Sequence, residues 1–274
     1  MSKKKRKPLA SRLQKLPIVP EKYREEITVV TGMHRSGTSC IAGMLAACGL
    51  YPGLSNTMIN KNTPQVSNEK GHFENYNMVV LNDYMLRAAG GKWKNPPPIK
   101  KIEEVGKVIS NHISEFSKTF NGNLVKDPRL CLTLKVWKDW CPRIGKVVVC
   151  LRNPLSVAKS LSRRDGISIE RGLSLWYEYN YRLMQNTDIE MIVVDYDELC
   201  LNTSKAIHNL LREIIPDILV KEDVIYTALS FFDKRLNHSC TPNVEDSIVR
   251  LPNFIQDPYY DLKLRAVNKW EVKI

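Results

Sequence analysis

The sequence predicts an α/β fold in which a mostly parallel central sheet is flanked by helices, in three layers. Three observations predict it. Short β-branched or apolar runs alternate with segments of helical periodicity, as in parallel sheets with crossover helices. A strand, a glycine-containing loop and an apolar helix follow one another in residues 27–48. Residues 147–151 form a continuous apolar run of the kind that a parallel sheet buries.

The first half of the chain is expected to hold one strand, a long loop and three helices. Ile27–Thr31 is a β-branched strand, and the apolar helix Cys40–Cys48 follows it and ends before Gly49. Residues 51–75 are rich in Asn, Pro and Gly and are expected to form a surface loop, which at that length is usually functional. Helices are expected over Asn77–Ala89 and Lys100–Phe120, separated by a break at "GGKWKNPPP".

The second half continues the alternation. Its expected elements are a short strand entering "NLVKDPRL", the strand Val147–Leu151, the helices Leu155–Ser162 and Gly172–Gln185, the strand Met191–Asp195, and helices over Thr203–Ile215 and 221–235. Residues 252–274, which carry prolines and aromatic residues, are expected to wrap over the domain.

Composition indicates a basic, solvated tail at residues 1–25 and one domain at residues 26–274. Of the net charge of +12, the first 25 residues supply +7, from nine Lys and Arg against two Glu. The run "SKKKRKP" is expected to be disordered, with a weak contact to an anionic surface as a lesser interpretation and with no nucleic-acid partner expected. The remaining +5 suits a protein that handles an anionic ligand.

The apolar runs, cysteines and histidines of the sequence argue against some classes of protein. No apolar run approaches the roughly 20 residues that span a bilayer, and no apolar segment follows the charged start, so a cytoplasmic protein is expected. The seven cysteines form no C-x-x-C pair and are interpreted as reduced thiols. The five histidines show no ligand spacing, so no metal site is expected.

The stretch "VVTGMHRSGTS" has the glycine spacing of a phosphate-binding P-loop, with four residues between Gly32 and Gly37. The lysine that should follow the second glycine is replaced by Thr38, and the nearest cation is Arg35 within the loop. An arginine fork can bind two oxygens, so the loop can hold a phosphate or sulfate ester while losing the usual grip on a Mg²⁺-bound triphosphate. Hydroxyl donors are supplied by Ser36, Thr38 and Ser39. The alternative is a plain strand-to-helix turn.

Two further strand ends carry charge. "VVVCLRNPLSVAKSLSRR" places Arg152 at the end of a buried strand and Ser160 on the helix that follows, which predicts a second anion site at the edge where open α/β sheets bind ligands. A surface arginine beside an exposed serine is the alternative. "LVKDPRLCL" gathers Lys126, Asp127 and Arg129 at another strand end, and an active-site lysine is the favoured interpretation.

The loop after the first helix contains "NEKGHFEN". Its acid and base side chains are Glu69, His72 and Glu74, any of which could deprotonate an incoming hydroxyl. A solvated side chain is the usual alternative for each of them.

Taken in order, "GMHRSGTS", "GHFEN", "KDPR" and "LRNPLSVAKSLSRR" resemble the sulfotransferases that use 3′-phosphoadenosine 5′-phosphosulfate, in particular bacterial members, and more distantly the tyrosylprotein sulfotransferases. The resemblance covers most of residues 27–200 and implies a P-loop NTPase-like fold. It implies the phosphosulfate nucleotide as co-substrate, no metal, and an acceptor hydroxyl for which a carbohydrate or glycan is favoured.

The resemblance also implies a role for each matching residue. The loop from Gly32 to Ser39 binds the 5′-phosphosulfate, with His34 a nucleotide contact or a further base. Arg152 and Ser160 bind the 3′-phosphate, to which Arg163 or Arg164 adds by position. Lys126 lies near the transferred sulfuryl group. Glu74 is the first choice for the base, with His72 and Glu69 behind it.

Two other functions stay open. A P-loop kinase or other NTPase would use Met191–Asp195 as its metal-binding strand, but Thr38 in place of lysine counts against it. A catalytically inactive relative that only binds nucleotide is the second alternative.

Overall fold

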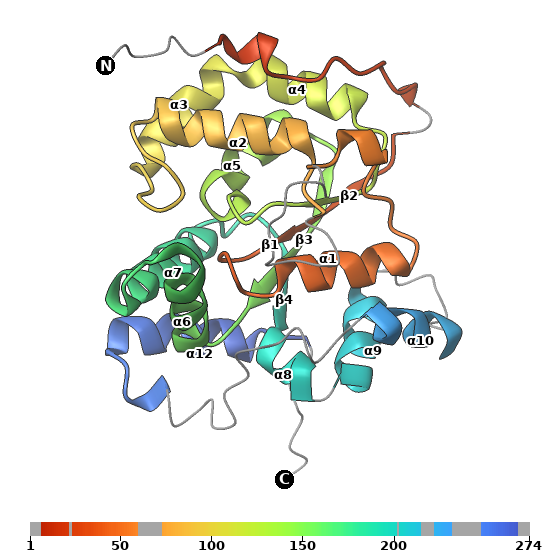
Figure 1. Ribbon diagram of the computed structural model, residues 1–274. Coiled ribbons are helices and arrows are strands. Elements are labelled where there is room, and N and C mark those ends of the chain that lie inside the picture. Colours follow the sequence, from red (N-terminus) through yellow and green to blue (C-terminus); the bar gives the residue numbers. More distant parts are fainter. Residues whose placement is uncertain are drawn as a thin grey trace.

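A four-stranded parallel sheet forms the centre of the protein. The computed structural model describes residues 7–21, 24–59, 73–201, 203–214, 222–231 and 248–267. Within them the strands are β1 (Ile27–Thr31), β2 (Leu124–Lys126), β3 (Ile144–Leu151) and β4 (Met191–Asp195), in the spatial order β2-β1-β3-β4, with every pairing parallel (Figure 1). The predicted parallel α/β class is confirmed.

Alternate residues of the central strands enter two separate hydrophobic cores. Val29, Val147 and Val149 belong to one cluster of buried residues, whereas Val30 and Val148 belong to the other. All five residues of β1 are buried, because helices cover both faces of the sheet and leave neither face to solvent. This explains why these strands are apolar without alternation and why three layers form.

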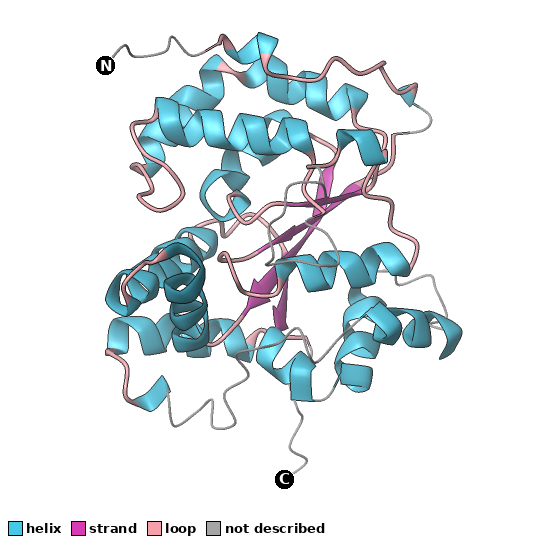
Figure 2. Cartoon of the chain, viewed as in Figure 1, coloured by secondary structure: helices cyan, strands magenta, loops and turns pink. Residues whose placement is uncertain are grey.

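The helices divide between the two faces (Figures 1 and 2). Core residues of α1 (Thr38–Ala47), α8 (Tyr196–Leu201), α9 (Thr203–Ile214) and α10 (Glu222–Phe231) lie in one cluster. The other cluster is formed with α2 (Tyr76–Ala88), α3 (Ile99–Val108), α4 (Ser110–Thr119), α5 (Leu130–Trp140), α6 (Pro154–Asp165), α7 (Ile169–Met184) and α12 (Asn253–Leu264). None of the helices in the described ranges is both long and apolar enough to cross a membrane.

The structure departs from the expected elements at three places. The helix expected over Lys100–Phe120 is two helices, α3 and α4, with Ile109 between them at φ −102° and ψ 11°. Helix α5 was not among the expected elements, although its sequence has the periodicity of an amphipathic helix. Helix α8 was not among the expected elements either.

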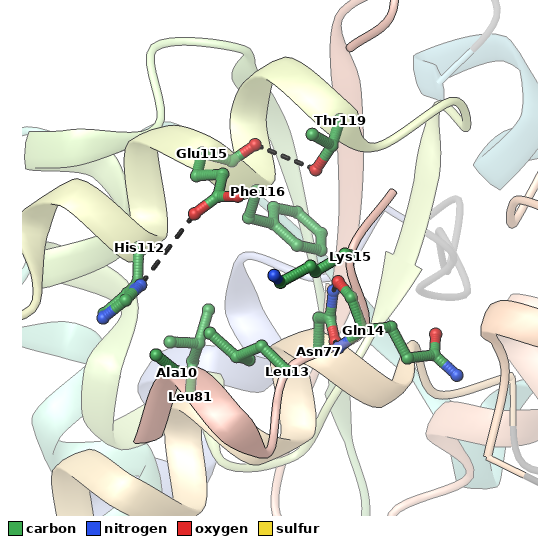
Figure 3. A pocket seen from close by; sticks show the side chains of 10 residues that line it. All are labelled: Ala10, Leu13, Gln14, Lys15, Asn77, Leu81, His112, Glu115, Phe116 and Thr119. Carbon is green, nitrogen blue, oxygen red and sulfur yellow. Dashed lines mark hydrogen bonds and ion pairs between the residues drawn. The ribbon is translucent and has the colours of Figure 1, made fainter. Parts of the chain in front are cut away.

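The N-terminal segment lies on the domain from residue 7 onward. Leu9 is buried in the core, and a short 3₁₀ helix spans Leu9–Ser11. The Gln14 amide donates to Asn77 Oδ1 over 2.8 Å, and Asn77 Nδ2 donates back to the Gln14 carbonyl over 2.9 Å. This part of the expected tail is therefore packed against α2, and Figure 3 shows Leu13 and Gln14 beside Leu81 and Asn77 of that helix. The basic run at residues 3–6 lies outside the described residues.

The C-terminal helix α12 packs against α7 and the sheet. The rings of Trp176 and Tyr259 lie 6.2 Å apart, and the Val267 amide donates to the Val193 carbonyl over 2.9 Å. This agrees with the expectation that the end of the chain wraps over the domain, up to residue 267. The loop expected over residues 51–75 is described at 51–59 and 73–75, where it contains a 3₁₀ turn at Ser55–Thr57.

Candidate anion-binding site

The carboxyl ends of the four strands meet at one edge of the sheet, which is where parallel α/β sheets bind ligands. β1 leads into the loop before α1, β2 into Asp127, β3 into Arg152 and β4 into Tyr196. All the stretches singled out in the sequence, apart from the loop at residues 60–72, are thus described at this edge.

The loop after β1 owes its shape to three residues with positive φ. Gly32 has φ 143°, Arg35 has φ 73° and Gly37 has φ 86°. A Cβ at Gly32 would lie 2.5 Å from the Cys150 carbonyl oxygen, and one at Gly37 would overlap the Tyr196 ring. The two glycines are therefore required by close approach as well as by backbone conformation. Arg35 carries a Cβ, so its left-handed conformation is strained, at a cost of roughly 1–2 kcal/mol for a non-glycine residue.

The loop can present hydrogen-bond donors to an anion. Gly37 is the N-cap of α1 and offers no side chain to satisfy the first amides of the helix, which also carry the positive end of its dipole. Ser36 is buried, and its Oγ has no hydrogen-bond partner within the described part of the chain. Thr38 is buried as well, and Ser39 is partly exposed. A buried hydroxyl beside uncapped amides fits an anionic group.

Arg35 joins the loop to the second predicted anion site. Its Nε donates to Ser160 Oγ over 2.9 Å, and Arg152 Nη1 donates to the Arg35 carbonyl over 2.9 Å. The structure therefore brings together Arg35, Arg152 and Ser160, which are far apart in the sequence. Arg152 is 6% exposed, and its guanidinium lies 5.1 Å from the Tyr196 ring centre. Ser156, on the same helix as Ser160, is buried.

Several cations crowd this region. Burial, followed by the charges of Arg164 and Arg152, lowers the pKa of Arg35 to about 10. Arg163 contributes in the same direction, while the carboxylate of Asp165 opposes it. Arg164 Nε donates to Asp165 over 2.6 Å. Like charges this close destabilise one another, and an anion bound between them would remove the repulsion.

His34 is enclosed by aromatic rings. Its ring centre is 4.3 Å from that of Trp93 and 5.9 Å from that of Tyr179, whose hydroxyl donates to the Trp93 carbonyl. Burial, with the nearby charges of Arg129 and Arg164 after it, holds the pKa of His34 well below its usual value. The imidazole is neutral at pH 7, and its Nε2 is buried with no hydrogen-bond partner in the described ranges. Trp93 lies in the "GGKWKNPPP" break.

Lys126 and Glu74 form an ion pair. Lys126 Nζ lies 2.7 Å from Glu74 Oε1, and the two side chains are 2% and 15% exposed. The structure thus joins the predicted lysine to the first choice for the base. The other two choices, Glu69 and His72, lie outside the described residues.

Asp127 and Arg129, the other charged residues of "KDPR", contact each other and side chains of α2. Asp127 is fully buried and accepts hydrogen bonds from Asn82 Nδ2 and from both the backbone and the guanidinium of Arg129. Arg129 Nε also lies 2.9 Å from Asp83 Oδ1. Burial raises the pKa of Asp127. These contacts tie α2 to the start of α5.

Sequence reasoning missed the carboxylate that faces Arg152. Asp197 Oδ2 accepts the Asn153 amide over 2.6 Å, and its Oδ1 lies 3.9 Å from Arg152 Nε. Asn153 in turn caps α6, because its Oδ1 accepts the Ser156 amide over 3.0 Å. The pattern of "VVDYDELC" predicts a strand followed by a turn. The signal that could have identified Asp197 is its position just past the end of a strand that reaches the same edge of the sheet.

No group of three or more His, Cys, Asp or Glu that could hold a metal ion occurs among the described residues. Six cysteines have free thiols; the seventh, Cys240, is outside the described ranges. A cavity of about 110 Å³ lies under the N-terminal segment, between it and α2 and α4 (Figure 3). Its ten lining residues include Lys15, His112 and Glu115 but none of the predicted site residues.

Comparisons with known proteins find distant structural likenesses. The chain matches no protein-family model and no curated protein. It is similar to a sulfotransferase from Mycobacterium avium (11% identity, 87% of this chain and 76% of that one, TM-score 0.45). It is also similar to the sulfotransferase domain from the curacin biosynthetic pathway (13%, 87% and 98%, 0.48) and to a sulfotransferase from Mycobacterium tuberculosis H37Rv (13%, 86% and 77%, 0.46). At this distance the function has to be argued from the residues of the site.

Proposed function

We propose that the protein transfers a sulfuryl group from 3′-phosphoadenosine 5′-phosphosulfate to an acceptor hydroxyl. The observation that carries the proposal is the contact between Arg35 and Ser160. It joins a P-loop without a lysine to a second cationic element at the end of β3. A nucleotide with anionic groups at both its 5′ and 3′ positions needs two such elements side by side.

The residues present fit that co-substrate. The Ser36 hydroxyl and the first amides of α1 suit the 5′-phosphosulfate. Arg152, Ser160 and Arg164 suit the 3′-phosphate. Burial and then the charges of Arg164 and Arg152 lower the pKa of Arg35, and a bound anion would offset both effects.

Two other residues, Thr38 and Asp195, argue against a kinase or NTPase. Thr38 occupies the position of the lysine that contacts the β- and γ-phosphates. Asp195, which would be the metal-binding aspartate after β4, uses its Oδ1 to accept the amides of Asp197 and Glu198 at the start of α8. The amides of α8 therefore already occupy the oxygen that a metal ion would need.

The chemistry follows from these roles. The bond between sulfur and the bridging phosphate oxygen breaks while a bond forms from sulfur to the acceptor oxygen, and the bisphosphate leaves. Arg35, Lys126 and the loop amides stabilise the charge that develops on the leaving phosphate. Glu74 accepts the proton of the acceptor hydroxyl, and alignment of acceptor, sulfur and leaving group supplies much of the acceleration.

A hydroxyl-bearing carbohydrate or glycan is the acceptor that we propose. The partly buried Trp93 ring beside His34 offers an apolar wall on which a sugar ring can pack. Tyrosine or a small phenol would use the same hydroxyl chemistry, and a panel of the three acceptor types distinguishes them.

The proposed donor is tested by thermal unfolding with adenosine 3′,5′-bisphosphate in the absence of Mg²⁺. A ligand that binds the native state raises the melting temperature by mass action, about 2.7 kcal/mol of stabilisation at a hundredfold excess over Kd. Stabilisation by Mg·ATP together with no effect of the bisphosphate would support the kinase instead. Bisphosphate binding without transfer to any acceptor of a broad panel would support the inactive relative.

A further inference from the structure

The backbone of the anion-binding loop is held by residues that follow β3 and β4. Arg35 adopts a left-handed conformation that its side chain disfavours, so the surrounding structure has to maintain it. The contact on its backbone comes from Arg152, whose Nη1 donates to the Arg35 carbonyl over 2.9 Å.

Asp197 contacts two consecutive residues at the end of β3. Its Oδ2 accepts the Asn153 amide over 2.6 Å, and its Oδ1 faces Arg152 Nε at 3.9 Å. The Arg152 carbonyl is fixed separately, by Trp176 Nε1 over 3.0 Å. The side chains of Asp197 and Arg152 are 6% and 7% exposed, so solvent screens their attraction weakly.

The neighbouring residue touches the loop from the same side. Tyr196 lies so close to Gly37 that a Cβ there would overlap its ring, and the ring centre is 5.1 Å from the Arg152 guanidinium. Tyr196 therefore packs against both Gly37 and Arg152, and Asp197, the next residue of α8, faces Arg152.

We infer that Asp197 is a positioning residue of the nucleotide site. It fixes Arg152 against the Arg35 carbonyl, and thereby keeps the loop in the shape in which its amides and Arg35 can bind an anion. It makes no contact with the ligand itself. For the identity of that ligand the inference rests on the proposed function.

The test is a double-mutant cycle on the affinity for adenosine 3′,5′-bisphosphate, measured by titration calorimetry without Mg²⁺. Asp197→Asn keeps the size of the side chain and removes its charge, and it should weaken binding about tenfold, the effect of a coupling of about 1.4 kcal/mol. Arg152→Gln should also weaken binding. The double variant should bind within about twofold of Arg152→Gln alone, because both changes interrupt the same chain of contacts.

Glu198→Gln is the matched control, since it removes a charge from the next position of α8, and its affinity should equal that of the wild type. Thermal unfolding of each variant without ligand checks that it is folded. If Asp197→Asn does not fold, Asp197→Glu replaces it in the cycle, because it keeps the charge and displaces the carboxylate by one methylene.

Wild-type affinity in a folded Asp197 variant overturns the inference, and so does a loss that adds in full to that of Arg152→Gln. If the wild type binds Mg·ATP or inorganic phosphate but no bisphosphate, the proposed donor is wrong and the cycle is repeated with the anion that binds. A wild type that binds none of these anions overturns both proposals.

Discussion

Lys126 Nζ lies 2.7 Å from Glu74 Oε1, and this buried ion pair joins the end of β2 to the residue before the N-cap of α2. Asn75 is that N-cap, and its side chain accepts the amides of Asn77 and Met78. The pair therefore fixes the start of α2 as well as Lys126 at the end of β2. Because removing one partner leaves the other buried without its counter-charge, the pair is expected to contribute to both stability and catalysis.

Glu74→Gln should lower stability and turnover together. The amide still accepts a hydrogen bond from Lys126, so we expect a loss of about 1–2 kcal/mol in the free energy of unfolding, measured in urea. Turnover should fall by about 10²-fold or more, as for loss of a general base, with unchanged affinity for the bisphosphate. Glu104→Gln is the control, because its pair with Lys101 is about 60% exposed on both sides, and it should cost under about 0.5 kcal/mol. Near wild-type turnover would transfer the role of base to His72 or Glu69.

Arg35→Gly and Arg35→Ala should separate strain from binding. Both variants remove the guanidinium, so both should lose about 1.5–3 kcal/mol of binding free energy for the bisphosphate. Only alanine keeps a Cβ at φ 73°, so the glycine variant should be the more stable of the two by about 1 kcal/mol in urea unfolding. Equal stability of the two variants would contradict the strain, and wild-type affinity would remove Arg35 from the site.

The sequence was sufficient for the elements whose signals are local. Ile27–Thr31 and Val147–Leu151 are apolar throughout because both faces of the sheet are covered, and glycines mark the loop between β1 and α1. Asn77–Ala89 was nearly correct, since its buried residues recur on one face. The alternation of strands and helices then fixes a parallel sheet, because parallel strands require crossovers.

Contacts between distant segments were out of reach of the same reasoning. The approach of Tyr196 to Gly37 and of Asp197 to Arg152 depends on how α8 packs, which no local pattern encodes. Leu9 was assigned to the tail because Lys and Arg dominate the composition of residues 1–25. Composition does not reveal that a single leucine in such a segment is buried in the core.

Gly37→Ala should be far more destabilising than the same change at Gly90. The two glycines have similar φ angles, 86° and 91°, so an alanine meets a similar φ strain at both positions. A Cβ at Gly37 overlaps the Tyr196 ring, whereas one at Gly90 meets no atom within 4 Å. We expect about 1 kcal/mol for Gly90→Ala and about 2–4 kcal/mol for Gly37→Ala, measured by urea unfolding. Equal costs would show that the Tyr196 ring moves aside freely.

Asp195 should make the protein more stable as the pH falls from about 6 to about 4. Burial, and then the Asp197 carboxylate, raise its pKa from 3.8 to about 6. In that pH window the folded chain holds a proton that the unfolded chain has released, so lowering the pH favours the folded state through this group. Asp195→Asn keeps an oxygen for the amides of Asp197 and Glu198 but cannot titrate.

The measurement is the free energy of unfolding of the wild type minus that of Asp195→Asn, from pH 7 to pH 4.5. This difference should rise as the pH falls, by at most about 3 kcal/mol, the equivalent of about two pKa units. His34 acts in the opposite direction, because its lowered pKa removes stability below about pH 6.5, but it is common to both proteins and cancels in the difference. A difference that stays flat across the range would mean that Asp195 has the same pKa in the folded and the unfolded chain.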